Sequence, residues 1–226
     1  MAGSTTTNKI FTLTYLQTGN MYGIILPESE EEAVFEIDEY FKEKVFLRVV
    51  DAEKLGISRA VLSQMAKRGE LQRMAQGVYA RPDTAPDELA LIGMRSANIV
   101  FSHETALNLH GLSNRIPAKP SITIPYGGSV PHSIASAVNA YRIRPQLHDI
   151  GRGTAMTFMG NEVACYDRER TICDIIRSYS RMDVETYANA IRNYAGSREK
   201  NMPQLVAYAQ AMGIERKVLK VMEVLV

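Results

Sequence analysis

The residue types best suited to bind a polyanion are concentrated in one short segment, ISRAVLSQMAKRGELQRMAQGVYAR, at residues 57–81. This segment contains five bases and one acid, which gives a local net charge of +4, whereas the whole chain has a formal net charge of +1. The local field at a surface influences the binding of a polyanion more than the summed charge of the protein does. The segment therefore predicts a nucleic-acid-binding surface.

Individual side chains of this segment match the donors and acceptors of double-stranded DNA. Arg59 can pair with a guanine edge, Gln64 with an adenine, and Ser63 with a base edge or a phosphate. Each phosphate charge that a lysine or arginine neutralises releases a counterion, which makes binding sensitive to salt. The side chains for which we predict phosphate contacts are Lys67, Arg68 and Arg73.

A short helix would hold these side chains on one face. Ser58 can cap the helix, Gly69 can end it, and the apolar residues Val61, Leu62 and Met65 share the opposite face. A helix of about 11 residues is marginal alone, so it must be held by packing of that apolar face. Two alternatives stay open: the charged face is only solvated, or the module docks a protein.

The neighbouring segments give an element order typical of a winged helix-turn-helix. Residues 33–44 (AVFEIDEYFKEK) predict an amphipathic, acidic helix that should face away from the duplex. Asp51 can cap a second short helix that stops at Leu55-Gly56. After Gly69, ELQRM and GVYAR predict a two-stranded ribbon around Ala75-Gln76.

Composition also suggests where the domains divide. RPDTAPDE (81–88) has two prolines and three acids and is the predicted boundary. In residues 1–32, IFTLTYL and MYGIIL could pair as a hairpin or form a loosely held arm. We therefore expect an N-terminal extension (1–32), a winged helix-turn-helix domain (33–82) and a larger α+β domain (86–226).

Strands in the middle and helices after them give the larger domain its α+β class, with a helical C-terminal tail. The predicted hairpin pairs 154–159 with 162–166 and turns on Gly160-Asn161. The other predicted strands lie near 121–124 and 140–144, and the predicted helices lie near 86–97, 102–110, 168–180, 184–195, 203–212 and 215–225.

Two groups of residues in this domain could carry enzymatic chemistry. His103, Glu104 and His110 suggest a zinc helix, but the histidines are seven residues apart where such a helix needs four, which favours core or helix-end histidines. Asp167 and Glu169 could bind magnesium for nuclease or nucleotidyl-transfer chemistry. The structural interpretation of the latter is favoured, with Asp167 as a helix cap and Glu169 in the first helical turn.

Arg170 and Asp174 are four residues apart and can pair on the same helix.

Other features of the sequence exclude several classes of protein. No phosphate-binding glycine loop or nucleophile elbow occurs, and Cys165 and Cys173 lack the spacing of zinc ligands. No membrane-spanning run or secretory signal is visible. We therefore expect no catalytic residues, metal or cofactor, and a cytoplasmic location.

Three motifs, taken in order, resemble the AbiEi family of bacterial antitoxins. They are LGISRAVLSQMAKRGELQRMAQGVYARPD, FSHETALNLHGLSNRIP and YDRERTICDIIRS, followed by a helical tail that ends in VMEVLV. The resemblance runs from about residue 45 to the end of the chain, and the first 32 residues depart from it.

The resemblance implies a type IV antitoxin. Family members bind inverted repeats in their own promoter through an N-terminal winged helix, and their C-terminal domain opposes a nucleotidyltransferase toxin without a known stable complex. No catalysis is implied. We expect two monomers or one homodimer to bind the inverted repeat. The DNA-facing positions that the resemblance carries over are Ser58, Arg59, Ser63, Gln64, Lys67, Arg73 and Gln76.

Two other functions stay open at the level of sequence. One is a stand-alone winged-helix transcriptional regulator whose second domain senses a ligand or forms oligomers. The other is a metal-dependent nuclease or nucleotidyltransferase that uses Asp167 and Glu169.

Overall fold

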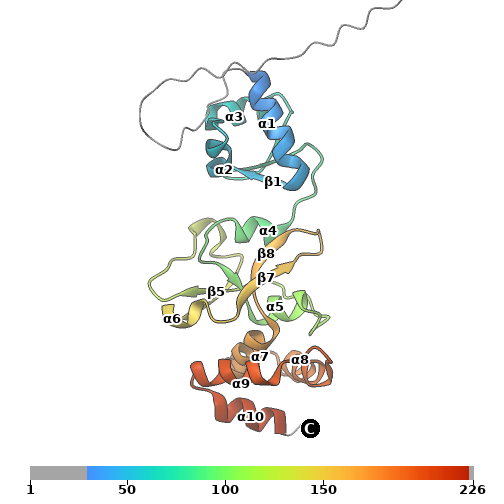
Figure 1. The fold of residues 1–226 in the computed structure, drawn as a ribbon, viewed down its shortest axis with the longest axis vertical. Coiled ribbons are helices and arrows are strands. Elements are labelled where there is room, and N and C mark those ends of the chain that lie inside the picture. Colours follow the sequence, from blue (N-terminus) through green and yellow to red (C-terminus); the bar gives the residue numbers. More distant parts are fainter. Residues whose placement is uncertain (1–29, 224–226) are drawn as a thin grey trace, which may run out of the picture.

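The computed structural model describes residues 30–223 of the 226-residue chain and confirms a mixed α+β fold with two sheets. Figure 1 shows an elongated molecule in which three groups of elements follow one another: helices with a small sheet, then a larger sheet, then a layer of helices. The pairing predicted between residues 10–16 and 21–26 lies outside the described residues. Within residues 30–223, no helix has the length and apolar character needed to cross a membrane.

The first group contains a three-stranded antiparallel sheet of order β1-β3-β2, where the sequence predicted a two-stranded ribbon. The third strand arises because residues 46–48 pair with β3, so that Leu47 lies opposite Tyr79. The bounds are α1 (Glu30–Glu43), β1 (Phe46–Arg48), α2 (Val49–Lys54), α3 (Arg59–Lys67), β2 (Gln72–Ala75) and β3 (Val78–Ala80).

The start of α2 differs from the prediction. Arg48 occupies the N-cap position without a side-chain cap, and Asp51 lies inside the first turn. The Asp51 carboxylate accepts hydrogen bonds from the Arg48 guanidinium at 2.6 and 2.9 Å and from Lys54 at 3.3 Å. The hydrogen bond from Arg48 lowers the pKa of Asp51. Asp51 therefore supports the helix start through its charge, which the helix dipole favours, and not as a cap.

One apolar cluster holds the three helices of this group together. Leu62 and Met65 of α3 are buried in it with Ile37 of α1, Ala52 of α2 and Leu47 of β1. Burial of a Leu or Ile side chain is worth about 1.5–3 kcal/mol, which is enough to fix helices too short to persist alone.

The second group is a five-stranded mixed sheet of order β6-β5-β4-β8-β7. The β5/β6 and β4/β8 pairs are parallel, and the other neighbouring pairs are antiparallel. The bounds are α4 (Glu88–Gly93), β4 (Val100–Phe101), α5 (His103–Leu109), β5 (Ser121–Pro125), η1 (His132–Ile134), β6 (Asn139–Ile143), α6 (Pro145–His148), β7 (Arg152–Met156) and β8 (Glu162–Tyr166).

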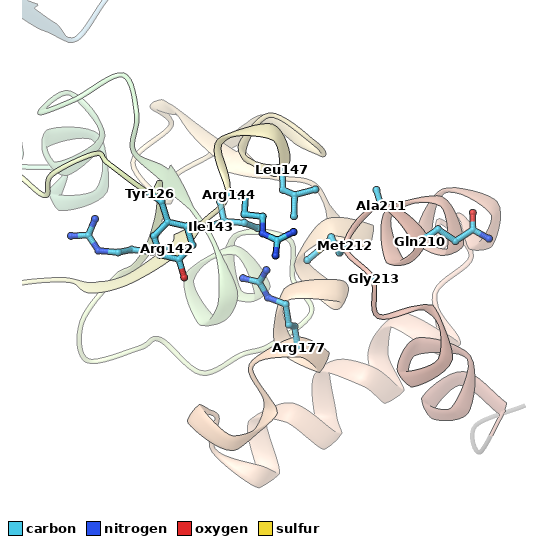
Figure 2. A pocket seen from close by; sticks show the side chains of 10 residues that line it. All are labelled: Tyr126, Arg142, Ile143, Arg144, Leu147, Arg177, Gln210, Ala211, Met212 and Gly213. Atoms are coloured by element: carbon cyan, nitrogen blue, oxygen red, sulfur yellow. The ribbon is translucent and has the colours of Figure 1, made fainter.

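The third group is a layer of helices on the far side of the sheet from the first group (Figure 1). The predicted helix 168–180 ends at Arg177 and is followed by a 3-10 turn. The bounds are α7 (Arg168–Arg177), η2 (Tyr179–Arg181), α8 (Val184–Gly196), α9 (Met202–Ala211) and α10 (Glu215–Glu223). A cavity of about 490 Å³ lies between this layer and the β6–α6 edge of the sheet (Figure 2).

The first group and the large sheet share an apolar cluster. Phe46 of β1 and Val78 of β3 are buried in it together with Ala90 and Ile92 of α4. The helix predicted at 86–97 is only residues 88–93, and the buried Asp87 caps it by accepting a hydrogen bond from the Ala90 N–H at 3.1 Å. The segment predicted as a domain boundary is therefore anchored at its end.

Candidate nucleic-acid interface

Helix α3 begins and ends as the sequence predicted. The Ser58 hydroxyl oxygen accepts a hydrogen bond from the Val61 N–H at 3.3 Å, which satisfies one free donor of the first turn. After Lys67 the chain turns at Gly69, whose φ of +79° is favoured by a residue without a Cβ atom. The turn directs the chain into β2.

The polar face of α3 is open to solvent. Arg59, Ser63 and Lys67, here called the α3 polar row, are spaced four residues apart and so follow one stripe of the helix. Arg59 and Lys67 are exposed and Ser63 is half-buried, whereas Leu62 and Met65 on the other face are buried. The row extends over about 12 Å of helix rise, close to the width of the DNA major groove.

The five lysine and arginine residues of segment 57–81 fall into two classes, those that pair with a carboxylate and those that do not. Arg68 forms a bidentate pair with Glu70 at 2.7 and 3.1 Å, and Arg81 pairs with Asp38 of α1 at 2.7 Å. Within residues 30–223, no carboxylate pairs with the other three bases, which are all exposed: Arg59, Lys67 and Arg73. The positive charge of these three side chains is therefore available to a ligand.

Two acidic residues of the first group line a cavity to which the α3 polar row does not contribute. Asp38 and Glu70, together with Arg68 and Arg81, line a cavity of about 780 Å³ between α1 and the end of α3. None of the residues of the row lines that cavity. The orientation of α1 away from a duplex stays a prediction.

The β2–β3 turn is held by a residue that the sequence did not single out. The side chains of Arg73 on β2 and Gln76 in the turn are exposed, and so is Gln64 on α3. The Arg95 guanidinium, which follows α4, donates a hydrogen bond to the Gln76 carbonyl at 3.0 Å. Nothing in the sequence links residues 76 and 95, because their proximity arises only from the packing of α4 on the small sheet.

The histidines of the larger sheet do not form a common site. His103 is fully buried, stacks on Tyr141 with ring centroids 3.4 Å apart, and its ring nitrogens lie 2.9 and 3.1 Å from the hydroxyls of Ser102 and Ser178. The His110 Nε2 atom instead lies 2.6 Å from the Tyr166 carbonyl oxygen. The interpretation as core and helix-end histidines is confirmed.

The paired carboxylates serve as helix anchors, as the structural interpretation predicted. Asp167 caps α7 by accepting a hydrogen bond from the Arg170 N–H at 2.8 Å, and it also accepts one from the Tyr208 hydroxyl at 2.9 Å. Glu169 is buried and accepts hydrogen bonds from the Tyr194 hydroxyl at 3.1 Å and the Asn201 N–H at 2.9 Å. Burial raises the pKa of Asp167.

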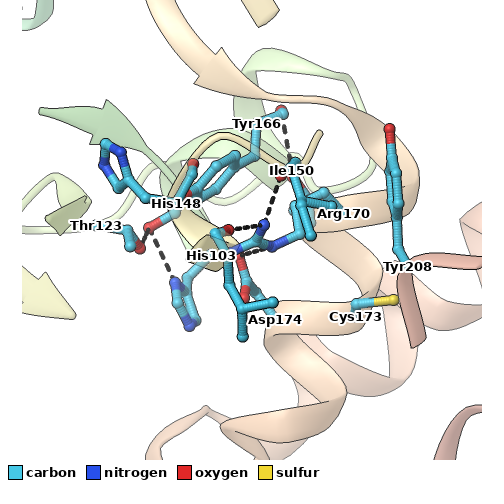
Figure 3. A network of polar contacts seen from close by, with 12 residues as sticks. His103, Thr123, His148, Ile150, Tyr166, Arg170, Cys173, Asp174 and Tyr208 are labelled. Carbon is cyan, nitrogen blue, oxygen red and sulfur yellow. Dashed lines mark hydrogen bonds and ion pairs between the residues drawn. The ribbon is translucent and has the colours of Figure 1, made fainter. Parts of the chain in front are cut away.

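The predicted pair of Arg170 and Asp174 forms the centre of a buried polar network (Figure 3). Their side chains are 0% and 1% exposed and meet at 3.2 Å. The Arg170 guanidinium also donates to the carbonyls of Leu147 and Ile150 and lies 4.1 Å from the centre of the Tyr166 ring. This network joins α7 to the segment between β6 and β7.

The two cysteines are free buried thiols, and burial raises the pKa of each to about 12. A reactive thiolate is therefore not favoured at either position near neutral pH. Among the residues that the structure describes, no three His, Cys, Asp or Glu side chains are grouped so that they could hold a metal ion.

Residues 36–82, which are 47 of the 226 residues, match the family described as transcriptional regulator, AbiEi antitoxin. The match includes the first of the three motifs that resemble this family except its last residue, Asp83, and the other two motifs lie outside it. The chain is also similar to the RV2827C protein from Mycobacterium tuberculosis, a crystal structure, with 14% identity and a TM-score of 0.46 over 89% of this chain and 83% of that one. No curated protein matches the chain.

Proposed function

We propose that the chain is a type IV antitoxin that represses its own operon by binding promoter DNA. The observation that carries the proposal is the α3 polar row, whose two ends are exposed cations that pair with no carboxylate among residues 30–223, in a segment that matches AbiEi transcriptional regulators. In this proposal residues 33–82 form a winged helix-turn-helix domain, and residues 86–226 form the antitoxin-type domain.

The geometry suggests how this domain would dock. Helix α3 would enter the major groove with Arg59 near base edges, while the β2–β3 ribbon would place Arg73 and Gln76 near the backbone. Arg68 would add a weaker phosphate contact, because Glu70 already offsets its charge. The proposed DNA-binding residues are Ser58, Arg59, Ser63, Gln64, Lys67, Arg68, Arg73 and Gln76.

The proposed partners follow from the family. The DNA site would be an inverted repeat in the chain's own promoter, read by two copies or by a homodimer. This chain would be cytoplasmic, and its functional partner would be a nucleotidyltransferase toxin, opposed without a stable complex and without catalysis by this chain. Growth rescue of toxin-expressing cells by the full-length chain tests this part of the proposal.

DNA binding is tested by titrating a labelled promoter fragment with full-length variants at several salt concentrations. Arg59→Ala should cost about 1–3 kcal/mol of specific binding free energy and reduce discrimination between sequences, because a base contact is lost. Lys67→Ala should weaken binding to all sequences and reduce the salt slope by about 1, because one phosphate contact is lost.

Lys217→Ala is the matched control, because Lys217 is an exposed base of α10 at the opposite end of the molecule (Figure 1). It should leave both the affinity and the salt slope unchanged. Unaltered retardation of the promoter fragment by both α3 variants would contradict the proposed interface.

A further inference from the structure

The cavity between the sheet and the helical layer has the size and charge of a small-molecule site (Figure 2). Its volume of about 490 Å³ falls within the range of about 300–1,000 Å³ that is typical of ligand pockets. Three arginines line it: Arg142 of β6, Arg144 before α6 and Arg177 at the end of α7. No carboxylate is among its lining residues.

Two of these arginines point at each other, and neither is in an ion pair among the described residues. Figure 2 shows the guanidinium groups of Arg144 and Arg177 converging across the cavity. Within the described range 30–223, neither forms an ion pair. Four other arginines in this part of the chain have a carboxylate partner, namely Arg115, Arg152, Arg168 and Arg170. Arg144 and Arg177, together with Arg142, differ from the remaining arginines without an ion pair because they line the same cavity. Like charges that line one cavity repel, so an anion between them is favourable.

The third arginine is engaged elsewhere. The Arg142 guanidinium donates a hydrogen bond to the Gly128 carbonyl at 2.6 Å, and its side chain points away from the other two (Figure 2). The pair of Arg144 and Arg177, here called the arginine clamp, is therefore the part of the cavity that is free to bind a ligand.

The chemistry of the clamp favours a phosphoryl group. Guanidinium groups present parallel N–H donors that match the spacing of phosphate oxygens. A phosphate monoester carries a charge of about −1.5 to −2 at pH 7 and so offsets two guanidinium charges, whereas one carboxylate offsets only one.

The rest of the cavity is too large for an inorganic anion alone. Leu147 and Met212 are half-buried walls beside the clamp, and Tyr126 at the rim is 59% exposed. Apolar walls and an accessible aromatic ring suit the organic part of a ligand, and a flat heterocycle can stack on such a ring.

We propose that the arginine clamp binds the phosphoryl group of a small phosphate monoester of mononucleotide size, with its organic part against Leu147, Met212 and Tyr126. The site lies between the large sheet and the helical layer and is separate from the α3 polar row. It does not depend on the proposed repressor function.

Calorimetric titration of the full-length chain with nucleoside 5′-monophosphates tests the proposal, with inorganic phosphate and adenosine as comparison probes. At least one monophosphate should bind saturably, inorganic phosphate should compete with it more weakly, and adenosine should not bind. Arg144→Gln should weaken binding by about tenfold or more, because a charge-assisted hydrogen bond is lost. Arg142→Gln, which removes the same charge from the same cavity, should change the affinity by less than about threefold, since exposed charges are screened.

Arg177→Gln should act like Arg144→Gln, but Arg177 also contributes to the field at Asp174 and His103. Arg144→Gln therefore decides the outcome. The proposal is overturned if no phosphorylated probe binds, if adenosine binds as well as its monophosphate, or if Arg144→Gln binds like the unaltered chain. Binding of single-stranded oligonucleotides alone would also overturn it in favour of a nucleic-acid surface. All three variants should keep the promoter affinity, which separates this site from the DNA interface.

Discussion

At the scale of single residues, His103 is held without charge where the sheet meets α7. It is 0% exposed, stacks on Tyr141 and contacts only hydroxyl groups through its ring nitrogens. Burial lowers its pKa well below the usual value, and the positive charges of Arg177, Arg181 and Arg170 lower it further. Its φ of +48° is in the left-handed region, which is uncommon for a residue other than glycine.

The depressed pKa of His103 predicts a loss of stability in mild acid. The unfolded chain takes up a proton near pH 6.5 and the folded chain does not, so protons favour unfolding below that pH. The free energy of unfolding should therefore fall by up to about 1.4 kcal/mol per pH unit from pH 6.5 downward. Urea unfolding at pH 7.5, 6.5 and 5.5 measures this slope.

His103→Gln should remove most of the slope even though it lowers the stability at every pH. His132→Gln, at an exposed histidine of η1, should leave it intact. An unchanged slope in His103→Gln would show that other groups cause the acid sensitivity.

The residues of the proposed interface were predictable to the extent that they depend on local chemistry. A serine cap, a glycine stop and a period of 3.6 residues are encoded within α3, so the exposure of Arg59 and Lys67 followed from the sequence. The pairing of Arg81 with Asp38 and the contact of Arg95 with Gln76 join distant segments. Only the folded chain shows which charges stay free.

At the scale of elements, Arg170 fixes α7 to the segment between β6 and β7. It donates hydrogen bonds to the carbonyls of Leu147 and Ile150 while it pairs with Asp174 (Figure 3). Gly151 allows this close approach, because a Cβ atom there would lie 2.5 Å from the Arg170 Cβ. In the described part of the chain, Arg170 Nη2 and Asp174 Oδ1 lack hydrogen-bond partners, so the pair is not fully compensated.

Arg170→Met should lower the free energy of unfolding by about 3–5 kcal/mol, because Asp174 would stay buried without its partner. Arg168→Met is the control: the Arg168 side chain is 21% exposed, Met retains its apolar stem, and the partner Glu199 is 79% exposed and returns to water, so the change should cost less than about 1 kcal/mol. Urea unfolding measures both. The double change Arg170→Met with Asp174→Leu should recover part of the lost stability, because no unpaired charge stays buried. If Arg170→Met and Arg168→Met cost the same free energy of unfolding, the assigned role of the network would be contradicted.

The elements that the sequence predicted well have their own caps. Helices α3, α7, α8 and α9 begin after Ser58, Asp167, Asp183 and Asn201, each of which accepts a backbone hydrogen bond. Strands β1 and β4 were missed, because three and two residues are too few to show an alternation. Asp51 was misassigned because an acid in a first turn and an acid at a cap are not distinguished by composition.

At the scale of the whole molecule, the first group and the large sheet are joined by a shared apolar cluster. If the chain were cut between residues 80 and 85 and the two fragments separated, Phe46 and Val78 of the N-terminal fragment would become exposed. Ala90 and Ile92 of the C-terminal fragment would become exposed as well. Either fragment would then present an apolar patch that favours aggregation. Point variants of the full-length chain therefore separate functions more cleanly than truncations do.

Such a variant should separate the proposed repression from the proposed toxin neutralisation. The α3 polar row and the helical layer lie at opposite ends of the molecule, with the large sheet between them (Figure 1). The double change Arg59→Ala with Lys67→Ala removes two exposed charges and no buried contact, so it should leave folding unaffected. In cells it should release a reporter driven by the chain's own promoter, while growth in the presence of the toxin stays rescued. The control Lys217→Ala with Lys220→Ala, at two exposed bases of α10, should keep repression. Loss of rescue by the α3 variant at normal protein levels would mean that neutralisation requires the DNA-binding surface, and the division of the two roles between the two ends would be wrong.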